Sequence, residues 1–106
     1  MTIYLLNTPI LTSYGEWHFE GPITVEQAKS RIAQGFKSAV GHEASAQFLS
    51  QLLDVDVTMN RISINMQADD EALVLRIKSR LPEGKLLTHV EIANTPYELG
   101  WLRKVS

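Results

Sequence analysis

Hydrophobic residues recur with a helical period in one stretch, from His42 to Leu53. With 3.6 residues per turn, apolar side chains gather on one side and polar side chains on the other. The apolar set is Ala44, Phe48, Leu49, Leu52 and Leu53, and the polar set is Glu43, Gln47, Ser50 and Gln51. The sequence therefore predicts an amphipathic helix over residues 42–53.

An earlier helix is predicted from its first turn. Thr24 is followed three places later by Gln27, the pattern of a capping box in which the two residues satisfy each other's backbone N–H groups. Val25, Ala28 and Ile32 share one face of this helix and are expected to be buried. Gly35 is well placed to end it.

Three segments of the first 40 residues have strand patterns. Residues 3–6 are continuously apolar, as in a strand covered on both faces. This run stops at Asn7, Thr8 and Pro9, and such a polar strand end is as often an ordinary loop as a ligand site. Residues 16–19 alternate and are expected to pair beside the first strand, before Gly21-Pro22 breaks the chain. Residues 36–40 are predicted to be a strand or strand-like segment.

Two later segments differ in how clearly their patterns indicate a strand. Residues 61–66 alternate, which predicts a strand with Ile62, Ile64 and Met66 toward the core and Arg61 at the head of the opposite face. Residues 72–81 fit a helix and a strand equally well by period. Pro82 disfavours a helical conformation at the residue before it, which favours the strand.

The last quarter of the chain carries weaker signals. Thr88 and Glu91 repeat the capping-box pattern and predict a short helix that ends near Asn94. In the tail, residues 97–106, Trp101 and Leu102 are expected to pack on the body or on a partner. The elements together predict a small α+β fold.

Composition limits the class of protein. The chain has 106 residues, of which 44% are hydrophobic and 21% charged, which is typical of one globular domain over residues 1–106. It contains no apolar run of membrane-spanning length and no signal-like start, so we expect no membrane partner and a cytoplasmic location. The absence of cysteine excludes disulfides, thiolate zinc sites and a cysteine nucleophile.

Charge bears on the choice of ligand. A net charge of −2 argues against a protein that coats long nucleic acid, because such a protein needs a broad basic surface. A small nucleotide held in a locally basic pocket remains compatible with this charge.

The chemistry-bearing stretch is 38–45, which combines a strand end, a glycine corner and the first turn of a helix. Gly41 allows a sharp turn and a close approach, and the first N–H groups of a helix attract an anion. His42 beside them is able to donate or accept a proton on a phosphate. Because His42 also lies within the apolar arc of the helix, a half-buried structural role stands as the alternative.

A second candidate site is the predicted turn 80–85, which contains three charged residues in Arg80, Glu83 and Lys85. Turns are usually charged because they face water. An arginine fork, a carboxylate and a lysine also make a workable phosphate clamp. Arg61 is open to the same two interpretations, a solvated strand-end charge or a ligand group. His18 and His89 are expected to be solvated surface residues.

Three short motifs occur together in this order: Leu6-Asn7, Ala39-Val40-Gly41-His42, and Arg80-Leu81-Pro82-Glu83-Gly84-Lys85. With them the chain resembles, over residues 3–92, the small ring nuclease family found in viruses of archaea and bacteria and beside some type III CRISPR systems. The resemblance implies degradation of cyclic tetra-adenylate, the second messenger that activates CRISPR ancillary nucleases. It also implies a homodimer with a mixed sheet of about five strands flanked by helices, and a ring bound across the dimer interface.

The resemblance assigns roles residue by residue. His42 matches the catalytic histidine, Arg80 and Glu83 match the active-site arginine and glutamate, and Arg61 matches a further important arginine. Some members carry a serine where Ile10 stands here, so Asn7 or Thr8 is expected to make that contact. The remaining residues expected to bind the ligand are Gly41, Ser45 and Lys85.

The chemistry that the resemblance implies needs no metal and no cofactor. A ribose 2′-hydroxyl attacks the adjacent phosphate, and the protein fixes geometry, offsets charge and protonates the departing 5′-oxygen. The products are linear di-adenylates with 2′,3′-cyclic phosphates, formed in the cytoplasm of the host cell if the protein is viral. The alternatives are a non-catalytic sponge for cyclic oligonucleotides and a protein-interaction module.

Overall fold

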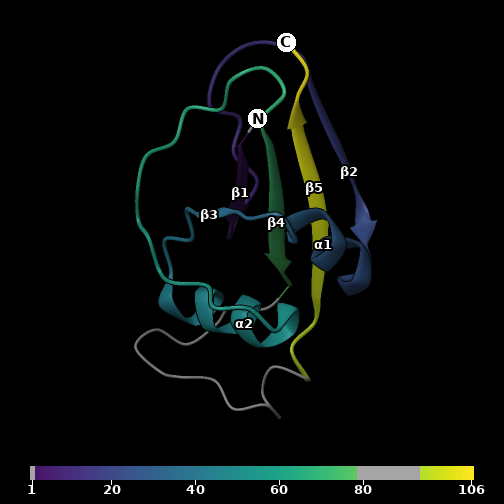
Figure 1. The fold of residues 1–106 in the computed structure, drawn as a ribbon, viewed down its shortest axis with the longest axis vertical. Helices are drawn as coiled ribbons and strands as arrows, with labels where there is room; N and C mark the ends of the chain where they lie inside the picture. The colour runs from purple at the N-terminus through teal and green to yellow at the C-terminus, as the bar shows by residue number, and fades with distance from the viewer. Residues whose placement is uncertain (1, 79–93) are drawn as a thin grey trace.

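The computed structural model describes residues 2–78 and 94–106, and its centre is a five-stranded sheet in the order β2-β5-β4-β1-β3 (Figure 1). The strands are β1 (Ile3–Leu6), β2 (Trp17–Ile23), β3 (Lys37–Ser38), β4 (Glu71–Ile77) and β5 (Tyr97–Lys104), and the helices are α1 (Val25–Ile32) and α2 (Glu43–Leu53). Strand β1 pairs in parallel with β3 and β4, whereas β5 pairs antiparallel with β2 and β4. The predicted α+β class with a mixed sheet of about five strands is confirmed.

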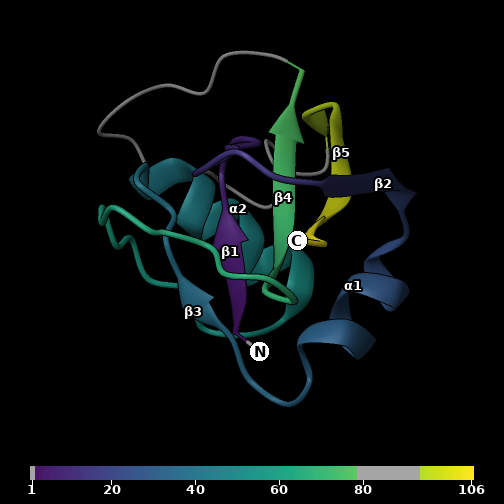
Figure 2. The same ribbon diagram turned by 90° about the horizontal axis from the view of Figure 1, so that it is seen from above.

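Both helices contribute to one core on one face of the sheet (Figure 2). The helices bury Ala28, Ile32, Ala44, Phe48, Leu49 and Leu53 against Leu5, Leu73, Leu75, Leu99 and Trp101 of the strands. Phe48 and Tyr97 meet edge to face, with ring centroids 5.4 Å apart. The predicted amphipathic face of residues 42–53 is therefore the face that α2 packs on the sheet.

The opposite face of the sheet has a smaller core of its own. It consists of Leu6, Ala39, Met66, Ala72, Val74 and Leu102, flanked by Tyr4, Trp17 and Ile64. Within the described ranges this core contains no helical residue, and the loop around Met66 covers it in part. The second face of the sheet is consequently less well covered than the first.

The burial of β4 explains why its sequence fitted the periods of a helix and of a strand equally well. Ala72, Leu73, Val74 and Leu75 are all 0% exposed, because β4 lies between β1 and β5 and is covered on both faces. A strand buried on both sides shows no alternation. The strand interpretation favoured by Pro82 is confirmed for residues 72–77, whereas residues 79–81 lie outside the described part of the chain.

The predicted strand over residues 61–66 is wrong. In the described structure these residues form no strand, and Ile62 is 40% exposed. The N–H of Met66 donates to Thr12 Oγ1 at 3.1 Å rather than to a neighbouring strand. Of the three alternating apolar residues, only Ile64 and Met66 pack on the second core.

The pairing expected for residues 16–19 needs correction, whereas the packing expected for the tail does not. The segment 16–19 does not pair beside β1; it belongs to β2, which continues through Gly21-Pro22 to Ile23 with a register shift and pairs with β5. The expectation that Trp101 and Leu102 pack on the body of the protein is confirmed, because residues 97–104 form β5, which brings Trp101 into the first core and Leu102 into the second. The strand-like segment 36–40 is confirmed only as the two-residue β3.

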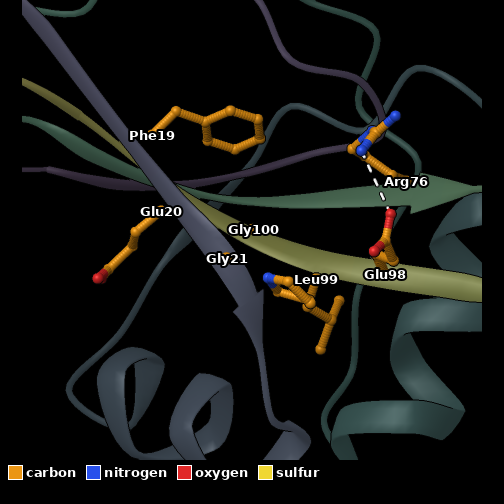
Figure 3. Close-up of a pocket in the computed structure, with 8 residues that line it drawn as sticks. Phe19, Glu20, Gly21, Arg76, Glu98, Leu99 and Gly100 are labelled. Carbon is orange, nitrogen blue, oxygen red and sulfur yellow. Dashed lines mark hydrogen bonds and ion pairs between the residues drawn. The ribbon is translucent and has the colours of Figure 1, made fainter.

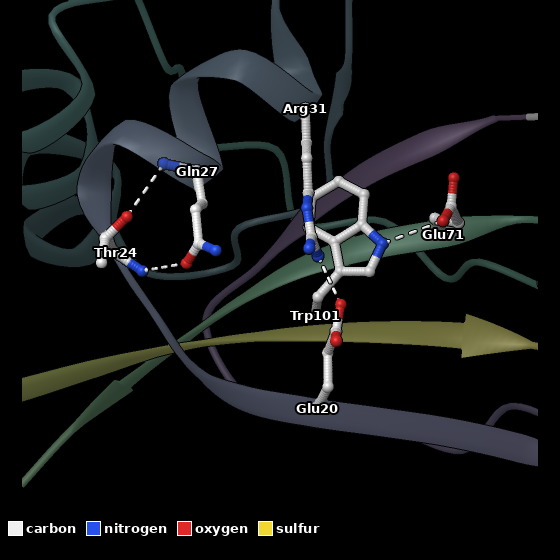
Figure 4. A network of polar contacts seen from close by, with 6 residues as sticks. All are labelled: Glu20, Thr24, Gln27, Arg31, Glu71 and Trp101. Carbon is white, nitrogen blue, oxygen red and sulfur yellow. Dashed lines mark hydrogen bonds and ion pairs between the residues drawn. The ribbon is translucent and has the colours of Figure 1, made fainter.

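Helix α1 is fixed at both ends (Figure 4). The capping box is present: Gln27 N–H donates to Thr24 Oγ1 at 3.1 Å and Thr24 N–H donates to Gln27 Oε1 at 2.9 Å. In the last turn, Arg31 pairs with Glu20 of β2 and lies 5.2 Å from the centre of the Trp101 ring. The two contacts of Arg31 attach the end of α1 to β2 and β5.

None of the helices in residues 2–78 and 94–106 has the length and apolar content that crossing a bilayer requires. The predicted turn 80–85 and, apart from Asn94, the predicted helix near 88–94 lie outside the described residues, as does His89.

Candidate functional site

The candidate site lies where the parallel strands β1 and β3 end. Parallel strands have their carboxyl ends at the same edge of a sheet, which is where ligands bind in open α/β sheets. Asn7 follows β1 directly, and residues 39–42 follow β3 and lead into α2. Strand β4 also runs parallel to β1, so it reaches the same edge at Ile77.

The loop between β3 and α2 is attached by one hydrogen bond to β1 and by another to Asn7, the residue after β1. Ala39 N–H donates to the carbonyl of Leu5 at 2.9 Å, which extends the pairing beyond β3. Gly41 N–H donates to Asn7 Oδ1 at 3.2 Å. Asn7 and Gly41, which the sequence placed in the same candidate site, are therefore in direct contact.

His42 is the N-cap residue of α2. It is half-buried, with an extended backbone (φ −135°, ψ 126°), and its side chain makes no capping hydrogen bond. Its Nδ1 atom is buried and has no hydrogen-bond partner in the described part of the protein. Such an unsatisfied buried atom costs about 1–3 kcal/mol.

The two helices differ in how they begin. The capping box of α1 satisfies N–H groups of its first turn, whereas α2 has no side-chain cap of this kind from His42. The unpaired N–H groups of a first helical turn attract negative charge. The beginning of α2 thus combines the anion-binding property of a helix N-terminus with an unpartnered imidazole nitrogen.

Arg61 packs directly on Gly41. A Cβ atom added to Gly41 would lie 3.3 Å from Arg61 Cγ and 3.9 Å from both Cβ and Cδ of Arg61. The guanidinium group begins at the atom after Cδ, so the positive charge lies close to the loop that carries His42. Gly41 therefore allows the close approach of an arginine, the use that its sequence position suggested.

A residue that the sequence did not indicate completes the arrangement. Asn60 donates through its side-chain amide to the carbonyl of Ser38 at 2.8 Å and through its backbone N–H to the carbonyl of Val40 at 2.8 Å. An asparagine in an irregular segment carries no periodic or motif signal. Only the tertiary structure shows that it joins residues 58–61 to the β3–α2 loop.

The other predicted site residues are placed as follows. Thr8 is exposed beyond the end of β1, and Ser45 is 7% exposed in the first turn of α2. Arg80, Glu83 and Lys85 lie outside the described residues. The structure therefore brings Asn7, Gly41, His42 and Arg61 together, with Ser45 following in the helix.

A separate cavity lies between β2 and the first half of β5 (Figure 3). Phe19 and Gly100 line it together with Arg76 and Glu98, whose side chains pair at 3.3 Å. None of the predicted site residues lines this cavity. In residues 2–78 and 94–106, no three His, Asp or Glu side chains form a group able to hold a metal ion.

Fold and site together define a small α+β domain with helices on one face of a mixed sheet and a candidate anion site at the edge where its parallel strands end. The chain belongs to the STIV B116-like family, whose model matches residues 3–99. The B116 protein of Sulfolobus turreted icosahedral virus has the same fold, with a TM-score of 0.79 over 97% of this chain and 99% of that chain at 20% identity.

Relatives occur in viruses and in a bacterium. The ORF117 protein of Acidianus two-tailed virus is 36% identical over 112 residues, covering 99% of this chain and 95% of that protein. Protein 26 of Sulfolobus islandicus filamentous virus is 44% identical over 70 residues, a match that spans 59% of that protein's length. YddF of Bacillus subtilis is 30% identical over 108 residues, 99% of each chain.

Proposed function

We propose that the protein is a metal-independent ring nuclease that cleaves cyclic tetra-adenylate and so switches off type III CRISPR signalling. The observation that carries the proposal is the half-buried His42, unpartnered at Nδ1, at the uncapped beginning of α2. Arg61 and Asn7 both contact the preceding Gly41. A proton donor, a positive charge and free helix N–H groups are what phosphodiester cleavage requires at one phosphate.

In this mechanism a ribose 2′-hydroxyl attacks the neighbouring phosphorus as its proton leaves to solvent. The bond from phosphorus to the 5′-oxygen breaks, and the His42 imidazolium gives its proton to that oxygen. The products are a 2′,3′-cyclic phosphate and a free 5′-hydroxyl. Arg61 and the first N–H groups of α2 offset the charge that builds up on the phosphate oxygens.

In the proposal, the residues of the predicted turn 80–85 complete the site. Arg80 holds the phosphate and Glu83 orients a neighbouring group or offsets its charge, while Lys85 adds positive charge. Arg80 follows Lys78 by two residues in the chain, and β4 ends at Ile77 on the edge where His42 lies. This connectivity is compatible with a common site.

Two cuts in one ring need two such sites. A chain with a single His42 supplies two sites when it forms a homodimer with two-fold symmetry, which matches the symmetry of a four-phosphate ring. Cleavage on both sides then gives two linear di-adenylates. The messenger is cytoplasmic, so the proposed enzyme acts there, in the host cell if the protein is viral.

The test is incubation of the purified protein with cyclic tetra-adenylate in a chelator, followed by chromatography and mass spectrometry of the nucleotides. The proposal expects linear di-adenylates that carry 2′,3′-cyclic phosphates. Intact ring that elutes with the protein identifies a sponge. A protein that neither binds nor cleaves the ring contradicts both the nuclease and the sponge and favours a protein-interaction module.

A further inference from the structure

Asn60 lies at the centre of the contacts between residues 58–60 and residues 38–40. Its side-chain amide donates to Ser38 and its backbone N–H donates to Val40, each at 2.8 Å. Ser38 Oγ in turn donates to the carbonyl of Thr58 at 2.6 Å. These hydrogen bonds fix the two segments to each other immediately before Arg61 on one and Gly41 on the other.

Arg61 differs from the other arginines of the described structure. Arg31, Arg76 and Arg103 each pair with a carboxylate. Among the described residues, Arg61 has no ion pair and no side-chain hydrogen bond, and the contact with Gly41 is made by the aliphatic part of its side chain. Its direction therefore depends on the backbone that carries it, which Asn60 attaches to the β3–α2 loop.

We infer that Asn60 is a positioning residue that holds Arg61 over Gly41, ready for a phosphate of the ligand; this rests on the proposed function. The charge of an arginine that pairs with no carboxylate is not offset by a neighbour and is available to a ligand. It must then be oriented by other means, because ordering a long side chain on binding costs conformational entropy. The Asn60 hydrogen bonds order the backbone beneath Arg61 before the ligand arrives.

The test is a double-mutant cycle with cyclic tetra-adenylate as the probe. Asn60→Ala removes the side-chain hydrogen bond and keeps the backbone one, so it is expected to weaken binding by about threefold to tenfold, the range set by one net hydrogen bond. In an Arg61→Ala background the same substitution is expected to have no further effect, because Asn60 acts through Arg61. Asn65→Ala, an exposed asparagine in the same segment whose side chain has no partner among the described residues, is the matched control and is expected to bind as the wild type does.

Equal effects of Asn60→Ala with and without Arg61 overturn the inference and show a purely structural role. A second readout needs no ligand: nuclear Overhauser contacts between the Gly41 Hα protons and the Arg61 side chain. They are expected in the wild type and lost in Asn60→Ala, and their persistence in the variant contradicts the inference. If Asn60→Ala does not fold, Ser38→Ala, which removes the hydrogen bond to Thr58, must weaken these contacts in the same way.

The proposed function and the positioning role of Asn60 are contradicted by different results. A wild-type protein that does not bind the ring contradicts the proposed function, and the Overhauser contacts still decide whether Asn60 positions Arg61. A wild-type protein that binds the ring, with Asn60→Ala binding equally well, contradicts the positioning role alone.

Discussion

Substitution of Gly41 by alanine separates folding from ligand binding. The new Cβ would lie 3.3 Å from Arg61 Cγ, slightly inside ordinary van der Waals contact, so the arginine stem must move by a few tenths of an ångström. Because that stem is flexible, the movement costs little. The substitution also removes conformational freedom from the unfolded chain, which stabilises by about 0.4–1 kcal/mol at a compatible position. We therefore expect the free energy of unfolding to change by less than about 1 kcal/mol.

Binding is expected to respond more strongly. A hydrogen bond to a charged group contributes about 1.5–3 kcal/mol, and displacing Arg61 loses part of it. Gly41→Ala should therefore bind cyclic tetra-adenylate about threefold to thirtyfold more weakly. The assay is a titration at fixed salt, paired with urea denaturation of the same samples.

Gly35→Ala is the matched control. Gly35 follows α1 with φ +125°, and no atom lies within 4 Å of a Cβ built there. Alanine at such a φ stores roughly 1–3 kcal/mol of strain but touches nothing near His42. The control should lose stability and keep its affinity for the ring. Binding of Gly41→Ala as tight as that of the wild type, or an equal loss of affinity in both variants, would contradict a role of Gly41 in placing Arg61.

Further predictions concern the core, Arg80 and the oligomeric state. Leu73→Ala, at a position that is 0% exposed, should lower the free energy of unfolding by about 2–5 kcal/mol, and an unchanged urea midpoint would contradict the assigned core. Arg80→Ala should weaken both binding and cleavage of the ring, whereas a titration that matches the wild type would make Arg80 an ordinary solvated turn residue. Sedimentation at micromolar concentration should show a homodimer, and a monomer both with and without ligand would exclude the two-site ring complex.

The sequence predicted those parts of the fold that local chemistry determines. The capping box of Thr24 and Gln27 and the apolar face of residues 42–53 each carry a complete signal within a few residues, and both are confirmed. The segment 61–66 shows the limit of periodicity. Ile64 and Met66 alternate because they pack on the second core, and packing does not require a paired neighbouring strand.

Long-range pairing was the part that the sequence did not reveal. Strand β5 lies between β2 and β4, although it follows them in the chain by many residues, and its residues gave no sign of a central position. The site was predicted in part for the same reason. Gly41 and His42 were indicated by a local motif, whereas the contact of Asn60 with Ser38 joins residues 22 positions apart.

The central claim, that His42 is the general acid, is tested most directly by single-turnover cleavage of cyclic tetra-adenylate by His42→Ala in the presence of a chelator. The variant should fold, because losing a half-buried imidazole with an unsatisfied nitrogen costs about 1–2 kcal/mol at most. It should bind the ring, and its cleavage rate should fall by roughly 10²–10⁴, the usual contribution of one positioned acid–base group. His18→Ala, at an exposed position of β2, should cleave as the wild type does. Cleavage by folded His42→Ala at a rate near that of the wild type would contradict the account.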